Sequence, residues 1–161
     1  MQHVDVGEVY DASTGALEAA KGPRLSLRRA VNALYDVVAA PIPARPDEWV
    51  DRLVPVLEHL CEVWEVHIRV TEAPGALYEE ILENAPRLAN RIARFKDEHA
   101  VLTTVLGGAM GQARDLNPSD PAAAERLRVR LVRLFGDLVR HSKRGMDLVY
   151  EAYHVDIGGE S

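Results

Sequence analysis

Cysteine is nearly absent from this chain, because Cys61 is the only one among its 161 residues. A single thiol cannot form an internal disulfide, a CxxC redox pair or a cysteine-rich zinc or iron–sulfur site. The chain also lacks a run of the ~20 apolar residues that cross a membrane, and residues 1–5 show no cationic start of a secretory signal. We therefore expect a soluble cytoplasmic protein.

Basic residues are in the minority, which limits the class of partner. The formal net charge is -6 and the sequence pI is about 5.5. Because an acidic chain is a poor binder of nucleic-acid phosphates or of an anionic membrane, we expect neither partner. Hydrophobic residues make up 47% of the chain, which at this length is enough for one domain with a single core.

Alternating apolar and polar runs, which predict strands, are missing, whereas apolar residues three and four apart, which predict helices, recur. Proline and glycine separate the helical segments. Ser26 is a suitable N-cap for the first helix, and Pro41 ends it. Asp120 followed by Pro121 is a strong start signal for the last. The expected helices cover residues 26–40, 47–72 and 76–83, residues from 86 to the glycine-rich stretch 107–111, and residues 121–153.

Four long helices with mostly short connections predict an all-α fold, an up-down-up-down four-helix bundle. Pro55 falls inside the second helix and should kink it without ending it. We assign residues 26–154 to the bundle, residues 1–25 to a partly ordered N-terminal arm and residues 155–161 to a non-helical tail.

His67, His99 and His141 each lie on the apolar stripe of a different predicted helix. Taken singly, a core histidine is more often a hydrogen-bonded residue than a metal ligand. Three of them on three helices suggest one shared polar site. The helical rise of 1.5 Å per residue places them at a similar level, near the end of the bundle where the second helix breaks at Pro74.

The segments around these histidines resemble hemerythrin-like proteins of the HHE cation-binding type. The resemblance covers residues 27–151 and implies a four-helix bundle that holds two irons between histidines and carboxylates. It is carried by His67 with the residues to 72 (HIRVTE), by residues 97–99 (DEH), and by His141 followed by residues 147–153 (DLVYEAY). Residues 155–159 (VDIGG) also look like the end of bacterial members of the family.

The ligand set that the resemblance implies for this chain is His67, Glu72, His99 and His141. Glu72 fits the family's carboxylate about one turn after the second-helix histidine. One turn after His141 stands Gly145, which cannot bridge two irons, and Asp147 would need a helical bulge to turn inward.

The first predicted helix differs from the family pattern as well. Its inward positions are Leu27, Val31 and Leu34, where the family places a histidine. The di-iron site that the resemblance implies is therefore incomplete in this chain.

Two functions remain open. In the first, the bundle holds one or two iron ions, or zinc, and leaves an open position for O₂ or another small ligand. An enzyme that uses this position is a special case, so enzymatic activity stays open. In the second, the fold is metal-free, and the histidines form a hydrogen-bonded cluster inside a structural or partner-binding module. A homo-oligomer is compatible with both.

Two polar neighbours are not expected to contribute to the site. His59 lies one position off the apolar stripe, between Glu58 and Glu62, which predicts an exposed side chain. Glu98 directly precedes His99 and should point away from the core into solvent.

Overall fold

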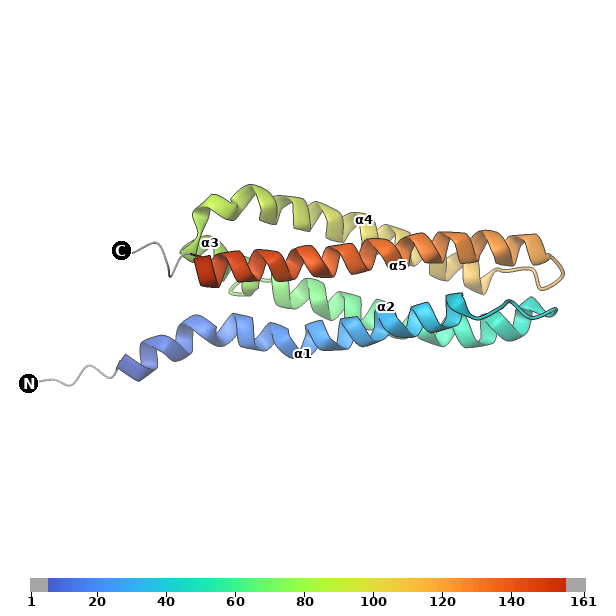
Figure 1. Ribbon diagram of the computed structural model, residues 1–161, viewed down its shortest axis with the longest axis horizontal. Helices are drawn as coiled ribbons and strands as arrows, with labels where there is room; N and C mark the ends of the chain where they lie inside the picture. The colour runs from blue at the N-terminus through green and yellow to red at the C-terminus, as the bar shows by residue number, and fades with distance from the viewer. Residues whose placement is uncertain (1–5, 156–161) are drawn as a thin grey trace, which may run out of the picture.

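Four long antiparallel helices form the fold (Figure 1). The computed structural model describes the backbone of residues 6–155 and the side chains of residues 15–154. The long helices are α1 (Val6–Ala39), α2 (Pro46–Glu72), α4 (Ala89–Arg114) and α5 (Pro121–Tyr150). The short α3 (Leu77–Asn84) and η1 (Pro86–Leu88) connect α2 to α4, and one π-helical turn, η2 (Glu151–Val155), follows α5. The predicted all-α, up-down-up-down bundle is confirmed, and no strand occurs between residues 6 and 155.

The helices are arranged in a ring, in which α1 packs against α2 and α5, and α4 packs against the same two helices. None of the helices between Val6 and Val155 has the length and apolar character that a membrane crossing requires. The start of α1 and the end of α5 lie at the same end of the rod, close to α3 (Figure 1).

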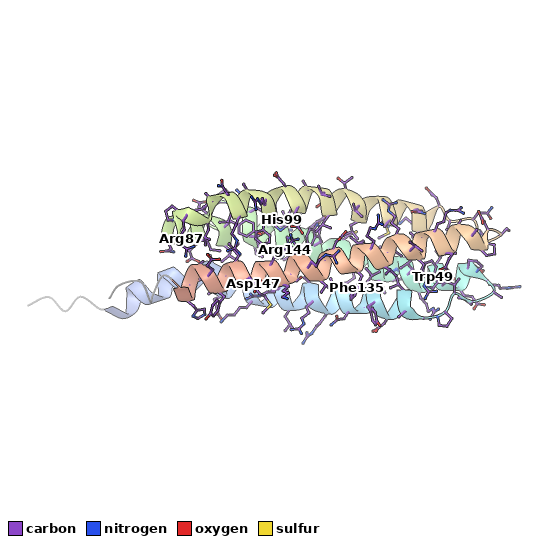
Figure 2. The ribbon with its side chains drawn as sticks, turned by 45° about the horizontal axis from the view of Figure 1, so that its top comes forward. Trp49, Arg87, His99, Phe135, Arg144 and Asp147 are labelled. Atoms are coloured by element: carbon purple, nitrogen blue, oxygen red, sulfur yellow. The ribbon has the colours of Figure 1, made fainter. Side chains whose placement is uncertain are left out.

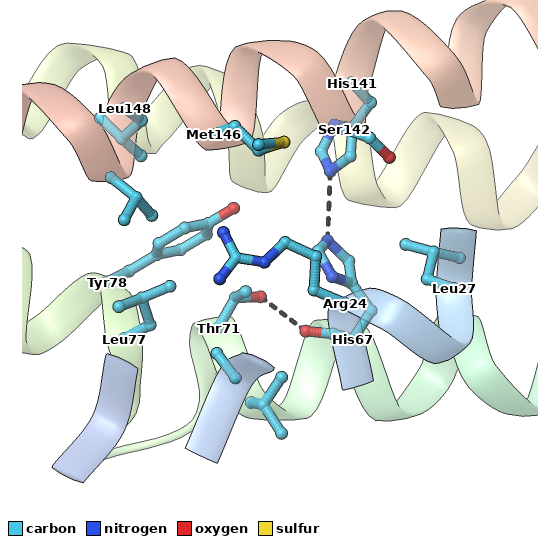
Figure 3. A pocket seen from close by; sticks show the side chains of 14 residues that line it. Arg24, Leu27, His67, Thr71, Leu77, Tyr78, His141, Ser142, Met146 and Leu148 are labelled. Carbon is cyan, nitrogen blue, oxygen red and sulfur yellow. Dashed lines mark hydrogen bonds between the residues drawn. The ribbon is translucent and has the colours of Figure 1, made fainter. Parts of the chain in front are cut away.

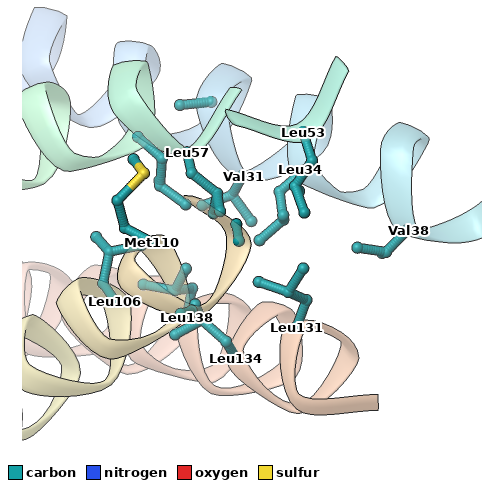
Figure 4. Close-up of a cluster of buried hydrophobic side chains, with 14 of the residues drawn as sticks. Val31, Leu34, Val38, Leu53, Leu57, Leu106, Met110, Leu131, Leu134 and Leu138 are labelled. Atoms are coloured by element: carbon teal, nitrogen blue, oxygen red, sulfur yellow. The ribbon is translucent and has the colours of Figure 1, made fainter. Parts of the chain in front are cut away.

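Two apolar clusters fill the interior. The larger is built from the stripes of all four long helices, including Leu34, Leu53 and Leu131 (Figure 4), which are at most 1% exposed. Burying one such side chain contributes roughly 1.5–3 kcal/mol, so these stripes account for the packing of the bundle. The smaller cluster lies at the α3 end and includes Tyr78 and Phe95.

The predicted histidines lie between these two clusters. On α4, Phe95 belongs to the smaller cluster, His99 follows it, and Leu102 belongs to the larger cluster. On α5, His141 likewise lies between residues of the larger and the smaller cluster. The bundle therefore contains one polar layer between two apolar ones.

Two predicted helix limits are wrong. The first helix does not start at Ser26, because α1 begins at Val6 and continues through Pro23. A proline removes one backbone hydrogen bond but bends rather than ends a helix that packs on both sides of it. The glycines at 107–111 do not end α4, which continues to Arg114. The division into arm, bundle and tail stays a prediction; residues 1–5 and 156–161 lie outside the described residues, and Val155 belongs to η2.

The predicted start of α5 is confirmed in atomic detail. The Asp120 carboxylate accepts a hydrogen bond of 3.1 Å from the backbone N–H of Ala123, and Pro121 occupies the first helical position. This cap satisfies one of the free N–H groups of the first turn. Pro55 lies inside α2, which continues to Glu72 as predicted.

Two glycines should respond to alanine in opposite directions. A methyl group at Gly145, inside α5, would meet no atom within 4 Å, so Gly145→Ala should raise the free energy of unfolding by about 0.5–1 kcal/mol. Gly75 has an equally open surrounding but a φ of 74°, so Gly75→Ala should lower it by about 1 kcal/mol. Urea unfolding of both variants measures this difference, and changes of the same sign would contradict it.

Candidate metal centre

His67 from α2, His99 from α4 and His141 from α5 point their rings at one another. Nε2 of His141 lies 3.2 Å from Nε2 of His67 and 3.1 Å from Nε2 of His99. His99 and His141 are 1% and 2% exposed, whereas His67 is partly exposed. Figure 2 places His99 in the half of the bundle nearer to Arg87 than to Trp49. The predicted convergence of the three histidines near the α3 end is confirmed.

Aromatic rings border the cluster on both sides, Trp64 from the larger core and Phe95 from the smaller one. The Trp64 ring stacks on His67 at 5.2 Å between centroids and meets His99 and His141 edge-on at 5.4 Å. Its indole N–H donates to Oγ1 of Thr103 at 2.9 Å, which fixes the ring. Phe95 meets His141 edge-on, also at 5.4 Å. These contacts keep water away from the imidazoles.

Burial keeps the three imidazoles neutral. It lowers the pKa of His67 to about 3, of His99 to about 4 and of His141 to about 3. The neighbouring histidines lower the pKa of His67 and His141 further, because each would repel a second positive charge. At neutral pH every ring therefore has one nitrogen with a free lone pair, which is the form that binds metal.

Two carboxylates lie behind the histidines. Oε2 of Glu72 lies 3.1 Å from Nδ1 of His99, which is hydrogen-bond distance. Oε1 of Glu98 lies 3.4 Å from Nδ1 of His141, and Arg144 holds this carboxylate in an ion pair. A carboxylate accepts hydrogen bonds, so it favours the tautomer in which Nδ1 carries the hydrogen and the facing Nε2 carries the lone pair.

The contact of His141 with Glu98 is an approach rather than a formed hydrogen bond. The buried Nδ1 of His141 has no well-aligned partner within the described part of the chain, although the oxygen of Glu98 is within 3.4 Å. At this distance the Glu98 carboxylate favours the tautomer of His141 that has its hydrogen on Nδ1. Nε2 of His141 and Nε2 of His99 then face each other as two acceptors 3.1 Å apart, an arrangement that calls for a cation or a proton between them.

The spacing of the nitrogens suits one metal ion. Metal–imidazole bonds of about 2.1 Å place ligand nitrogens about 3.0 Å apart along an octahedral edge and about 3.4 Å apart along a tetrahedral edge. Two of the three nitrogen–nitrogen separations, 3.1 and 3.2 Å, fall between these values. One ligand atom from each histidine lies within 4.8 Å of the others. The three histidines can therefore hold one metal ion.

A cavity of about 50 Å³ opens on the side of the cluster that faces α1 (Figure 3). His67 and His141 line it together with Tyr78, Gly145 and Arg24. The Tyr78 hydroxyl lies 3.5 Å from Nε2 of His99, and burial raises the pKa of Tyr78 well above its ordinary range, so the phenol stays protonated. The cavity leaves one side of the histidine cluster unfilled, next to a hydroxyl that can donate a proton.

Comparisons with known proteins add no assignment. No protein-family model, curated protein or solved structure matches the chain. The candidate metal centre therefore rests on the positions of its own side chains.

The structure gives the four predicted ligands different positions. It brings the three histidines together and places Glu72 behind His99, on the far side of the ring from the cluster. Asp147 is exposed on α5, which continues to Tyr150 without the bulge that would turn it inward. The level of α1 that lines the cavity presents Arg24 and Leu27, so no histidine comes from this helix.

The prediction that Glu98 is solvated is wrong. Its side chain is 23% exposed and reaches from α4 to His141 and Arg144 on α5. A residue next to a core position lies about 100° around the helix, which here is the side that faces the neighbouring helix rather than water. His59 is exposed as predicted, with 62% of its side chain accessible.

Proposed function

We propose that the bundle binds one divalent transition-metal ion, iron or zinc, through Nε2 of His67, His99 and His141. The observation that carries this proposal is the pair of carboxylates next to Nδ1 of His99 and Nδ1 of His141. They favour lone pairs on the two Nε2 atoms that lie 3.1 Å apart. A bound ion would supply an open coordination position toward the cavity for O₂ or another small ligand.

The proposed family is that of the hemerythrin-like proteins, as a member with a reduced site. The four-helix bundle and the inward histidines on α2, α4 and α5 support it. Two features favour one ion over the family's pair. No bridging carboxylate follows His141, because Gly145 stands one turn later, and Glu72 is engaged with His99. Without a bridging negative charge, two cations a few ångströms apart would repel each other strongly.

Several residues prepare the site for the ion. The Trp64 ring excludes water from the core side of the cluster, which keeps the histidines neutral. Glu72 lies next to Nδ1 of His99, and Glu98 lies next to Nδ1 of His141. A carboxylate in this position orients the imidazole ring and makes its Nε2 a stronger metal ligand. Tyr78 places a hydroxyl where it can donate to a ligand in the cavity.

A metal-free bundle is the second candidate, and one observation favours it. The Nε2 separations of 3.1 and 3.2 Å are also hydrogen-bond distances, so a proton on one ring could bridge to the next. The cluster would then be a polar contact that aligns three helices in a structural or partner-binding module. A cytoplasmic location and self-association are compatible with both the metal-binding and the metal-free bundle, and both stay proposals.

Metal content distinguishes the two candidates. We expect about one iron or zinc ion per chain after purification without a chelator or an affinity tag, and about one equivalent of Co²⁺ after reloading. Elemental analysis measures the first and the visible Co²⁺ spectrum the second. His59→Ala is the control, since this exposed histidine of α2 lies outside the cluster. A chain that binds no ion would favour the metal-free bundle, and two ions per chain would contradict a single site.

A further inference from the structure

Arg24 brings a positive charge to the cavity beside the histidines. It is partly buried on α1 and lines the cavity together with His67 and His141 (Figure 3). Its charge is close enough to His67 to contribute to lowering the pKa of that imidazole. Arg24 forms no ion pair with a carboxylate in the described part of the chain, and the cavity lining contains no aspartate or glutamate.

A groove with basic residues in its lining adjoins this cavity. It lies between α1 and α5, has a volume of about 720 Å³ and shares Arg24, Ser142 and Met146 with the cavity. Its lining also includes Lys21, Arg28 and Lys143, and no carboxylate. Lys21 pairs with Glu18, which leaves the other cations to set the local potential.

The sign of this groove is opposite to that of the whole chain, whose net charge is -6. Clefts lined by one sign of charge raise the local concentration of ions of the opposite sign. The basic residues of this groove therefore favour the approach of anions over cations.

The balance of charges around the histidines also favours an anion. A divalent ion on three neutral imidazoles would lie near Arg24, while Glu98 is already paired with Arg144. Lys96 also acts on Glu72, the other carboxylate of the site. The occupied site would thus hold an excess of positive charge in a partly buried cavity, which an anion between the ion and Arg24 would neutralise.

We infer that the small ligand of this site is an anion that enters through the α1–α5 groove and is held between the metal position and Arg24. The cavity of about 50 Å³ sets its size. A water molecule needs roughly 10–15 Å³ measured in this way, so the cavity admits an anion of about three or four non-hydrogen atoms, such as a small carboxylate or nitrite. This inference rests on the proposed metal site and specifies its ligand.

Formate and formamide test the inference, because they match in size and differ in charge. Each is titrated at constant ionic strength into Co²⁺-loaded protein, and the visible spectrum reports binding. We expect formate to bind at least about tenfold more tightly than formamide, and Arg24→Met to remove most of this preference while Co²⁺ stays bound. Arg24→Lys, which keeps the charge, should retain the preference within about threefold.

Arg28→Met is the matched control. Arg28 lies one turn further along α1 and lines the groove but not the cavity, so its loss should change the preference by less than about threefold. If Arg24→Met binds Co²⁺ and keeps the full preference for formate, the anion inference is wrong and the metal site stands. If the unmodified protein binds no Co²⁺, the metal proposal fails and the anion inference fails with it.

Discussion

Acid should unfold the metal-free protein steeply below pH 6.5. The folded-state pKa values of His67, His99 and His141 are about 3, 4 and 3, against 6.5 for an unperturbed histidine. Below pH 6.5 the unfolded chain binds protons that the folded chain does not, so the free energy of unfolding falls as the pH falls toward 4. Each histidine contributes up to about 1.4 kcal/mol per pH unit, and the three together up to about 4.

Such a slope would remove a large share of the 5–15 kcal/mol that is typical of a folded domain within about two pH units. Glu72 acts in the opposite direction, since burial raises the pKa of this carboxyl and its protonation as the pH falls favours the folded state. Urea unfolding between pH 7 and 5 measures the dependence. His67→Gln should lower the slope by about one third. His59→Gln is the control for a histidine outside the cluster, since this side chain is exposed. Equal slopes in the parent and His67→Gln would refute the buried, neutral cluster.

Removing His141 should have the largest effect on metal binding. Its Nε2 is the one nitrogen within 3.2 Å of both other imidazoles, so its loss leaves two ligands and a gap on the α5 side. Replacement of an outer hydrogen-bond partner typically costs 10–100-fold in metal affinity, and loss of a ligand should exceed about 100-fold. We therefore expect His141→Ala to abolish Co²⁺ binding at micromolar protein, and Glu72→Gln and Glu98→Gln to weaken it about tenfold or more.

Competition with a chelator of known affinity measures these constants, and thermal unfolding of each variant checks that the bundle remains folded. His141→Gln, which fills more of the space than alanine, covers the case in which His141→Ala does not fold. Retention of the parent affinity in both His141 variants would place the ion elsewhere. An effect of Glu72→Gln without one of Glu98→Gln would show that only His99 is oriented by a carboxylate.

The sequence allowed the bundle and the three histidines to be predicted, because both depend on helical periodicity. A spacing of three and four fixes which face is buried, and the helical rise fixes the level. His99, for example, lies on the same helix face as Phe95 and Leu102, as their spacing predicts. The side chains of Phe95, His99 and Leu102 are all buried. Proline predicted the helix limits less well, since Pro23 lies inside α1. A proline in the sequence does not show whether the helix bends there or ends there.

Residues beside the buried stripe were harder to place. Whether Glu98 meets water or α5 depends on how closely the neighbouring helix packs, which periodicity does not determine. Arg24 lies on a helix whose inward positions are all apolar, and its long side chain reaches the cavity from the edge of that face. Both contacts join residues far apart in sequence, and neither residue type is unusual on a helix surface.

The polar layer also divides the bundle into two parts of unequal stability. The larger cluster holds all four long helices together, whereas the smaller one joins α3 and η1 to α1 and to the adjoining ends of α4 and α5. Elements with fewer buried contacts open at lower free energy than the rest of a domain. Local opening of the α3 end would uncover His99 and His141, which are 1% and 2% exposed in the closed bundle, while the larger cluster stays folded. The rate at which a bound ion leaves the site would then depend on the rate of local opening at the α3 end. Amide hydrogen exchange in α3 would report the same opening.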